Sequence, residues 1–127
     1  MREEISLDIT SRILSLADIE RALMLKGGSG SRSIGNALPG DRVVSTSVLR
    51  LEPNLDERAA LRQQIDAIRA RMPADRLRAA NLQVEVIFNI AVYFDTACAT
   101  TIIDPELVAL IADYSATIQV VAYPVSD

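Results

Sequence analysis

The sequence predicts one α+β domain over residues 1–127. Three observations carry this prediction. Residues 82–94 place an apolar side chain at every second position, capped helical patterns separate shorter strand-like segments, and half of all residues are apolar. The order is strand, helix, strand, helix, strand, helix, strand. We interpret it as a ferredoxin-like split βαβ with an extra helix inserted between its two halves.

The chain begins with a predicted strand and a predicted helix. Apolar and polar side chains alternate over residues 4–10, which is typical of a half-buried strand. Ser15 then precedes a helical apolar stripe, and Asp18 follows three residues later near the positive helix end. The helix is expected to stop at Gly27, where a left-handed backbone carries no penalty.

The middle of the chain predicts a loop, a strand and the longest helix. Residues 27–41 contain all five glycines, which predicts an exposed, mobile loop. Residues 43–51 are rich in β-branched side chains and predict the second strand. Asn54 and Glu57 resemble a capping box, so we expect a helix from there to the break at Pro73.

The last part of the chain predicts two strands with a helix between them. The alternation over residues 82–94 exceeds the usual strand length, so we expect a bend or bulge within it. Asp104 followed by Pro105 is a well-motivated helix start. Residues 117–123 predict the final strand.

A parallel α/β sandwich is the alternative architecture. Central strands of a parallel sheet are apolar on both faces. Only the strand over residues 82–94 approaches this pattern, and its second face still carries Glu85 and Asn89. The sequence therefore favours a sheet with antiparallel pairs.

Five segments spread over nearly the whole chain carry a family resemblance. They are Ser15-Leu16-Ala17-Asp18-Ile19, Leu25-Lys26-Gly27, the strand at 43–51 running into Leu55-Asp56, Asp104-Pro105-Glu106-Leu107, and the strand at 118–123. Together they resemble the DUF4279 family, a group of small, mostly bacterial domains of unknown function. Many members carry a tryptophan in the second strand, and this chain has none. The resemblance implies no known activity and no catalytic residues.

Residue types that are missing narrow the chemistry. The chain has no histidine and one cysteine, Cys98, so it offers no Ser-His-Asp or Cys-His arrangement and no zinc site built from nitrogen and sulfur ligands. We therefore expect no cofactor and no metal. The sequence favours a role other than catalysis but leaves the enzyme question open, because Asp, Glu, Arg, Tyr or Lys side chains can also carry chemistry. No stretch approaches the roughly 20 apolar residues of a membrane span, and nothing resembles a secretory signal, so we expect a cytoplasmic protein without membrane contact.

A first candidate site is the glycine-rich loop. Lys26, Gly28, Gly30 and Arg32 combine free amides with cations, and such a loop can hold a phosphate. A phosphate-binding P-loop, however, follows a strand and ends with its lysine, whereas this loop follows a helix and begins with its lysine. A flexible connector is the simpler interpretation.

A second candidate surface is polar and follows the long strand. It comprises Asp95, Thr96, Cys98, Asp104 and Asp113. A thiol with a depressed pKa would make Cys98 a nucleophile. The competing interpretation is a polar turn with a small, partly buried cysteine.

The distribution of charge suggests a function. Residues 21–80 carry an excess of basic groups, whereas residues 81–127 hold six acids and no Lys or Arg. We expect a binding or interaction module that captures a basic protein through its acidic C-terminal third. Homodimerisation through the second face of the strand at 82–94 is also expected. The alternative is a small-molecule sensor with its ligand at the dimer interface or under the 27–41 loop, and nucleic-acid binding is not expected because aromatic residues are few.

Overall fold

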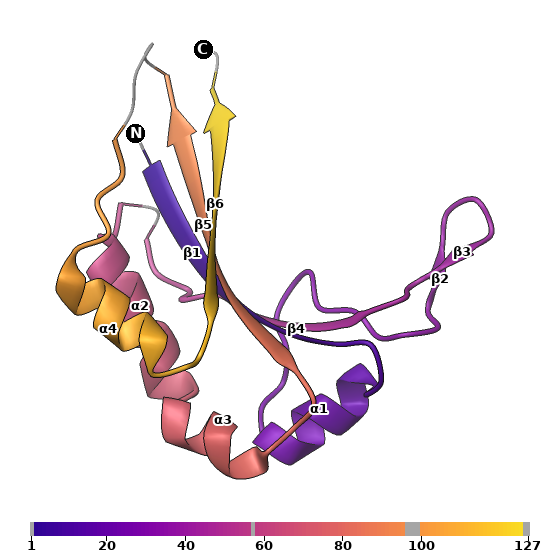
Figure 1. Cartoon of the computed structure of the whole chain (residues 1–127). Coiled ribbons are helices and arrows are strands. Elements are labelled where there is room, and N and C mark those ends of the chain that lie inside the picture. The colour runs from indigo at the N-terminus through magenta and orange to yellow at the C-terminus, as the bar shows by residue number, and fades with distance from the viewer. Residues whose placement is uncertain (1, 57, 96–99, 126–127) are drawn as a thin grey trace.

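A computed structural model describes residues 2–56, 58–95 and 100–125 of the chain (Figure 1). The described residues form helices and strands that are, in chain order, β1 (Arg2–Ser11), α1 (Leu16–Leu23), β2 (Ala37–Leu38), β3 (Arg42–Val43), β4 (Ser47–Leu51), α2 (Leu61–Arg71), α3 (Ala74–Ala80), β5 (Glu85–Phe94), α4 (Pro105–Ala112) and β6 (Thr117–Pro124). The α+β class is therefore confirmed.

Four strands make one mixed sheet in the order β4-β1-β5-β6. Strand β1 pairs antiparallel with β4 and with β5, whereas β5 and β6 are parallel. The fully parallel alternative is therefore wrong. A split βαβ places a third strand between the two strands of each unit. Here β1 and β4 are direct neighbours, as are β5 and β6, so the ferredoxin-like order is not confirmed in detail.

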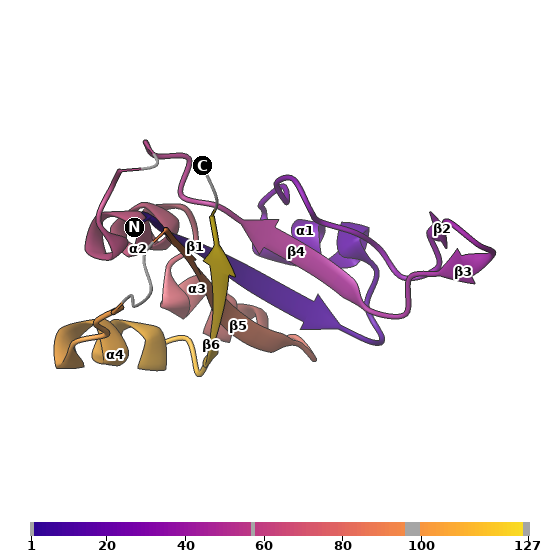
Figure 2. The same ribbon diagram turned by 90° about the horizontal axis from the view of Figure 1, so that it is seen from above.

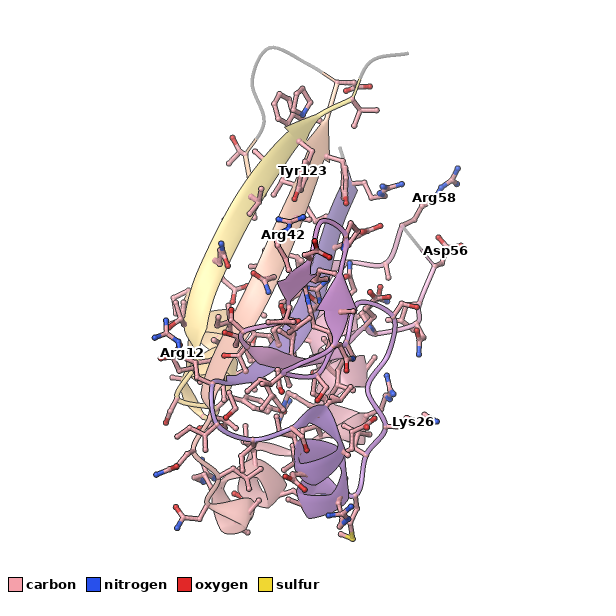
Figure 3. All side chains as sticks on the ribbon, turned by 90° about the vertical axis from the view of Figure 1, so that its right-hand side faces the viewer. Arg12, Lys26, Arg42, Asp56, Arg58 and Tyr123 are labelled. Carbon is pink, nitrogen blue, oxygen red and sulfur yellow. The ribbon has the colours of Figure 1, made fainter. Side chains whose placement is uncertain are left out.

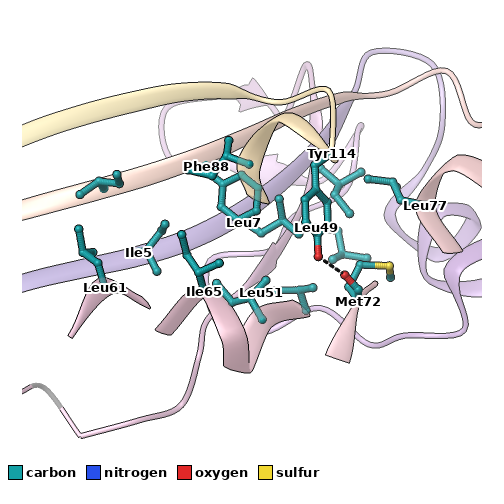
Figure 4. Close-up of a cluster of buried hydrophobic side chains, with 14 of the residues drawn as sticks. Ile5, Leu7, Leu49, Leu51, Leu61, Ile65, Met72, Leu77, Phe88 and Tyr114 are labelled. Carbon is teal, nitrogen blue, oxygen red and sulfur yellow. Dashed lines mark hydrogen bonds between the residues drawn. The ribbon is translucent and has the colours of Figure 1, made fainter. Parts of the chain in front are cut away.

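The helices cover one face of this sheet and bury its apolar side chains (Figures 1 and 2). Every second residue of β1 and β5 points into that layer, as the alternation predicts. The aromatic centre of the core is Phe88 against Tyr114, with ring centroids 5.2 Å apart in an edge-to-face arrangement (Figure 4). The Tyr114 hydroxyl also donates a hydrogen bond of 2.6 Å to the carbonyl of Met72 at the end of α2.

Two of the predicted helix starts are confirmed. The Ser15 hydroxyl accepts a hydrogen bond from the amide of Asp18 at 3.1 Å. Likewise, an Asp104 carboxylate oxygen accepts from the amide of Leu107 at 2.8 Å. Each bond satisfies an amide in the first turn that has no partner within the helix.

The start predicted for the long helix is wrong. Helix α2 begins at Leu61, because Asn54 adopts a left-handed backbone with a φ of 55° and turns the chain instead. The helix is capped by the side chain of Gln63, which accepts from the amide of Ala60 at 3.0 Å. Glu57 lies outside the described residues.

The hairpin β2–β3 was not predicted. The expected strand at 43–51 divides into β3 and β4, and β3 pairs back on β2. Gly40 and Asp41 turn this hairpin with φ angles of 77° and 60°. It projects from the sheet on the side opposite to the helices (Figure 1). The expected long strand is also shorter, since β5 begins at Glu85.

Candidate functional site, the open face of the sheet

The second face of the sheet, which we call the open face, has no helix over it (Figure 1). A hollow of about 710 Å³ lies on this face. Its walls come from β1, β4, β5 and β6 and from the segment 52–56 that follows β4. Its lining includes the charged or polar side chains of Glu4, Asp8, Arg50, Glu52, Asp56, Asn89, Tyr93 and Tyr123.

A polar network joins three strands at the floor of the hollow. The two carboxylate oxygens of Asp8 accept from Arg50 Nε at 2.8 Å and from Arg50 Nη2 at 2.9 Å. Asn89 Nδ2 donates to the same carboxylate at 2.6 Å. The residues belong to β1, β4 and β5, and Asp8 is 5% exposed. The bidentate geometry therefore satisfies a carboxylate that would otherwise be buried without a partner.

This network favours the charged form of Arg50. The hydrogen bonds to Asp8 raise the pKa of the Arg50 guanidinium above its ordinary value. Arg50 therefore stays protonated, and its charge is balanced by Asp8. The pair acts as a neutral floor rather than as an acid and a base.

Stacked aromatic rings form one end of the hollow. Tyr93 and Tyr123 are partners in the parallel register of β5 and β6, and their ring centroids lie 5.3 Å apart with an interplanar angle of 19°. The guanidinium of Arg2 lies 4.3 Å from the centroid of the Tyr93 ring and forms an ion pair with Glu4. Tyr123 is 45% exposed and stands at the top of the sheet (Figure 3). This end presents an aromatic surface that already holds a cation.

Carboxylates outnumber cations around the hollow. Four acidic side chains line it, and Arg50 is the one lysine or arginine among the lining residues. Because Asp8 is paired with Arg50 and Glu4 is paired with Arg2, the excess negative charge comes from Glu52 and Asp56. The electrostatic field of the hollow therefore favours a positively charged occupant.

The glycine-rich loop is held against β4 and does not hang free. The amide of Gly28 donates to the carbonyl of Arg50 at 2.8 Å, and Arg32 exchanges two backbone hydrogen bonds with Val48 at 2.9 and 2.8 Å. Gly30 has a φ of 85°, and a Cβ there would lie 2.9 Å from Arg50 Nη1. The first part of the loop thus packs along the sheet edge, and its expected mobility stays a prediction.

Several amides of the expected anion site, among them those of Gly28 and Arg32, already donate hydrogen bonds within the protein. The amide of Gly27 donates to a carboxylate oxygen of Glu20 at 2.8 Å, which also brings a negative charge to the loop. Lys26 is exposed and lies away from the hollow (Figure 3). A phosphate would have to displace these bonds, so the loop is better explained by its role in the fold.

The acidic candidates do not converge on one site. Asp104 starts helix α4 and Asp113 follows its end, which separates them by roughly 13 Å at 1.5 Å per residue. The backbone carbonyl of Asp113 accepts from Arg78 at 2.7 Å. Asp95 follows β5. Thr96 and Cys98 lie outside the described residues.

Sequence reasoning missed the residues that build the open face. Asp8 and Arg50 are charged residues within predicted strands, and each falls on the polar side of its alternation. Gln64 interrupts the apolar stripe of α2 and is 3% exposed. A polar residue inside an apolar stripe was the available signal, but its partner depends on the register of the strands.

Comparison with known proteins returned no match. No protein-family model, curated protein or solved structure matches the chain. The DUF4279 resemblance therefore stays a prediction. Among the described residues, no helix is long and apolar enough to cross a membrane, and no group of three or more acidic or thiol side chains is placed to hold a metal ion.

Proposed function

We propose that this protein is a binding module that holds a positively charged segment of a protein partner against its open sheet face. The observation that carries the proposal is the hollow with its excess of carboxylates over cations. Glu52 and Asp56 supply most of the attraction, since Glu4 is already paired with Arg2, and the stack of Tyr93 on Tyr123 supplies an aromatic surface for a lysine or arginine side chain.

A binding role also agrees with the hydrogen bonding at the polar floor of the hollow, where Asp8 is bonded to Arg50 and Asn89. Both oxygens of Asp8 accept hydrogen bonds, and Arg50 is held in its charged form. A general base needs a free lone pair and a pKa near the working pH. The network at the floor therefore supports positioning of a ligand rather than proton transfer.

The expected interaction with a basic partner is kept, but the surface that we assign to it moves. The acids of the C-terminal third are spread over α4 and the end of β5, and Glu106 is paired with Arg62 at 2.9 Å. The open face instead concentrates acids from the first half of the chain around one hollow. A cytoplasmic location remains part of this proposal.

Two matched triple variants test which surface captures a basic segment. The first carries Glu4→Gln, Glu52→Gln and Asp56→Asn, and the second carries Asp95→Asn, Asp104→Asn and Asp113→Asn. The probe is a short peptide of alternating arginine and glycine, and calorimetry at low salt measures its affinity. We expect the first variant to bind at least about tenfold more weakly, since each rim charge contributes a fraction of a kcal/mol or more.

The outcomes of this experiment are distinct. Weaker binding in the first variant alone supports the open face. Weaker binding in the second variant alone would transfer the function to the C-terminal third. Equal affinity in both variants and the parent protein would reject electrostatic capture altogether.

A small molecule is a second candidate occupant. The hollow has a volume of about 710 Å³, which lies within the usual range of small-molecule sites. Native mass spectrometry of freshly purified protein tests this role, because a retained metabolite adds a reproducible mass. A thermal shift with organic cations, absent in Tyr123→Ala, would place that ligand at the aromatic end.

A further inference from the structure

The outer edge of β6 is a free sheet edge within the described part of the chain. Strand β6 is the last strand in the sheet order and pairs only with β5. Its outward N–H and C=O groups therefore have no strand partner among the described residues. Such an edge is a template for another strand.

The chemistry of β6 gives this edge no protection against pairing. Its sequence, Thr117-Ile-Gln-Val-Val-Ala-Tyr-Pro124, has no charged residue, and its proline stands at the last position. Natural edge strands usually carry a lysine, a central proline or a bulge that prevents association. Val120 lies at the middle of the strand and is 50% exposed.

We propose that β6 pairs antiparallel with β6 of a second copy of this chain, which continues the sheet from four strands to eight across a two-fold axis. The proposal does not depend on the function assigned to the open face. In such an isologous pair, each residue of the strand faces a residue of the same strand. A charged edge would then repel itself, and β6 is neutral along its whole length.

A second copy fits this edge better than the sheet face that was expected to dimerise. The open face carries the Asp8, Arg50 and Asn89 network and a hollow of about 710 Å³, so a flat partner would cover buried polar groups and leave a void. The β6 strand carries no charged side chain and pairs with β5 without interruption from Thr117 to Pro124. Helix α4 lies beside it in the helix layer and exposes Val108 (Figure 2).

The same substitution at two exposed valines tests the proposal. Val120→Lys places two ammonium groups near each other at the centre of the paired strands. Val43→Lys is the matched control, because Val43 is 62% exposed on β3 and lies on the projecting hairpin. We expect a dimer for the parent protein and for Val43→Lys, and a dissociation constant raised roughly a hundredfold in Val120→Lys.

Light scattering after size-exclusion chromatography and native mass spectrometry measure the oligomeric state, and circular dichroism confirms that each variant is folded. A mixture of Val120→Lys with Val120→Glu should recover the dimer as a heterodimer, because opposite charges then meet at the axis. A monomeric parent protein at micromolar concentration would overturn the proposal. Dissociation by Val43→Lys with a stable Val120→Lys dimer would overturn it as well and assign the contact to the hairpin.

Discussion

The two edges of the sheet are finished in opposite ways. At the β4 edge, the glycine-rich loop supplies backbone partners through Gly28 and Arg32. Beyond the end of β4, the side chain of Gln64 supplies the hydrogen-bond partners of β1. It accepts from the amide of Ile5 at 2.9 Å and donates to the carbonyl of Glu3 at 2.7 Å. At the β6 edge, no described strand pairs with the outer side of β6.

This difference shows how the chain uses polar groups. A buried backbone group without a partner costs about as much as a lost hydrogen bond, so the covered edge is closed within the monomer. At the bare edge, the outward backbone N–H and C=O groups of β6 can bond to water or to a second chain. One edge therefore contributes to folding stability, and the other is available for assembly.

Replacing Gln64 should cause the largest loss of stability at the covered edge of the sheet. In Gln64→Leu, the Ile5 amide and the Glu3 carbonyl lose their partner, as does the carbonyl of Ala59, which accepts from Gln64 at 2.9 Å. We expect the free energy of unfolding to fall by about 2–4 kcal/mol, because one buried amide and two partly buried carbonyls lose their hydrogen-bond partner. Urea denaturation followed by circular dichroism measures the change.

The neighbouring Gln63 provides the control for this prediction. Its side chain is exposed and accepts one hydrogen bond at the start of α2. Gln63→Leu should therefore cost about 1 kcal/mol or less. Equal losses in the two variants would show that Gln64 does not act through the strand edge.

Asp8→Ala should weaken the same side of the sheet by about 2 kcal/mol. The substitution leaves the Arg50 guanidinium and the Asn89 amide without their acceptor. The loss is smaller than for a fully buried pair, because the Arg50 side chain is 35% exposed and water screens its charge. Thermal unfolding measures the effect.

An exposed aspartate sets the baseline for Asp8. Asp66 pairs with Arg62 and Arg69 at 3.4 Å on the surface of α2. Asp66→Ala should change stability by less than about 1 kcal/mol. If Asp66→Ala were as costly as Asp8→Ala, the special role of the sheet-spanning network would be refuted.

Sequence alone predicted the parts of the fold that depend on local chemistry. The alternation in β1 and β5, the Ser15 and Asp104 caps and the α+β class follow from side-chain periodicity and first-turn hydrogen bonds. The predicted start of α2 was wrong because Asn54 forms a left-handed turn instead of a helix cap. Asparagine is favoured in both settings, so the residue type alone does not decide between them.

The strand order and the site required tertiary information. A strand pattern gives the face that is buried but not the neighbour, so the adjacency of β1 and β4 was not available. The pairing of Asp8 with Arg50 depends on that adjacency, since residues 8 and 50 are opposite each other in the antiparallel register. The open face could therefore be predicted as mixed in polarity, but not as a hollow with a neutral floor.

Tyr114 anchors α4, the helix that precedes the bare strand β6. Removing the Tyr114 hydroxyl group should have an intermediate effect on stability. Tyr114→Phe loses the hydrogen bond to the carbonyl of Met72 but keeps the ring against Phe88. We expect a loss of about 1–2 kcal/mol at neutral pH, measured by chemical denaturation. A loss below the error of that measurement would show that the hydroxyl bond adds nothing to the packing.

Tyr114 also predicts a loss of stability in alkali. Burial raises the pKa of Tyr114 to about 12, above the ordinary value of 10 that applies in the unfolded chain. The stabilisation from the neutral phenol is therefore fully present below pH 10 and is lost as the pH rises towards 12. Across this range the parent protein should lose more stability than Tyr114→Phe. Parallel curves for the two proteins would contradict this assignment.

The contact between the glycine loop and β4 predicts the smallest effect. Gly30 and Gly35 have nearly the same φ, 85° and 86°, so alanine suffers the same backbone strain at both positions. A Cβ at Gly35 meets no atom within 4 Å, whereas at Gly30 it would lie 2.9 Å from Arg50 Nη1.

Gly35→Ala therefore measures the strain alone, at about 1 kcal/mol. Gly30→Ala should cost a further few tenths of a kcal/mol, because the flexible end of Arg50 has to move. That extra cost should vanish in an Arg50→Ala background. If it persisted there, the extra cost would not come from contact with the Arg50 side chain.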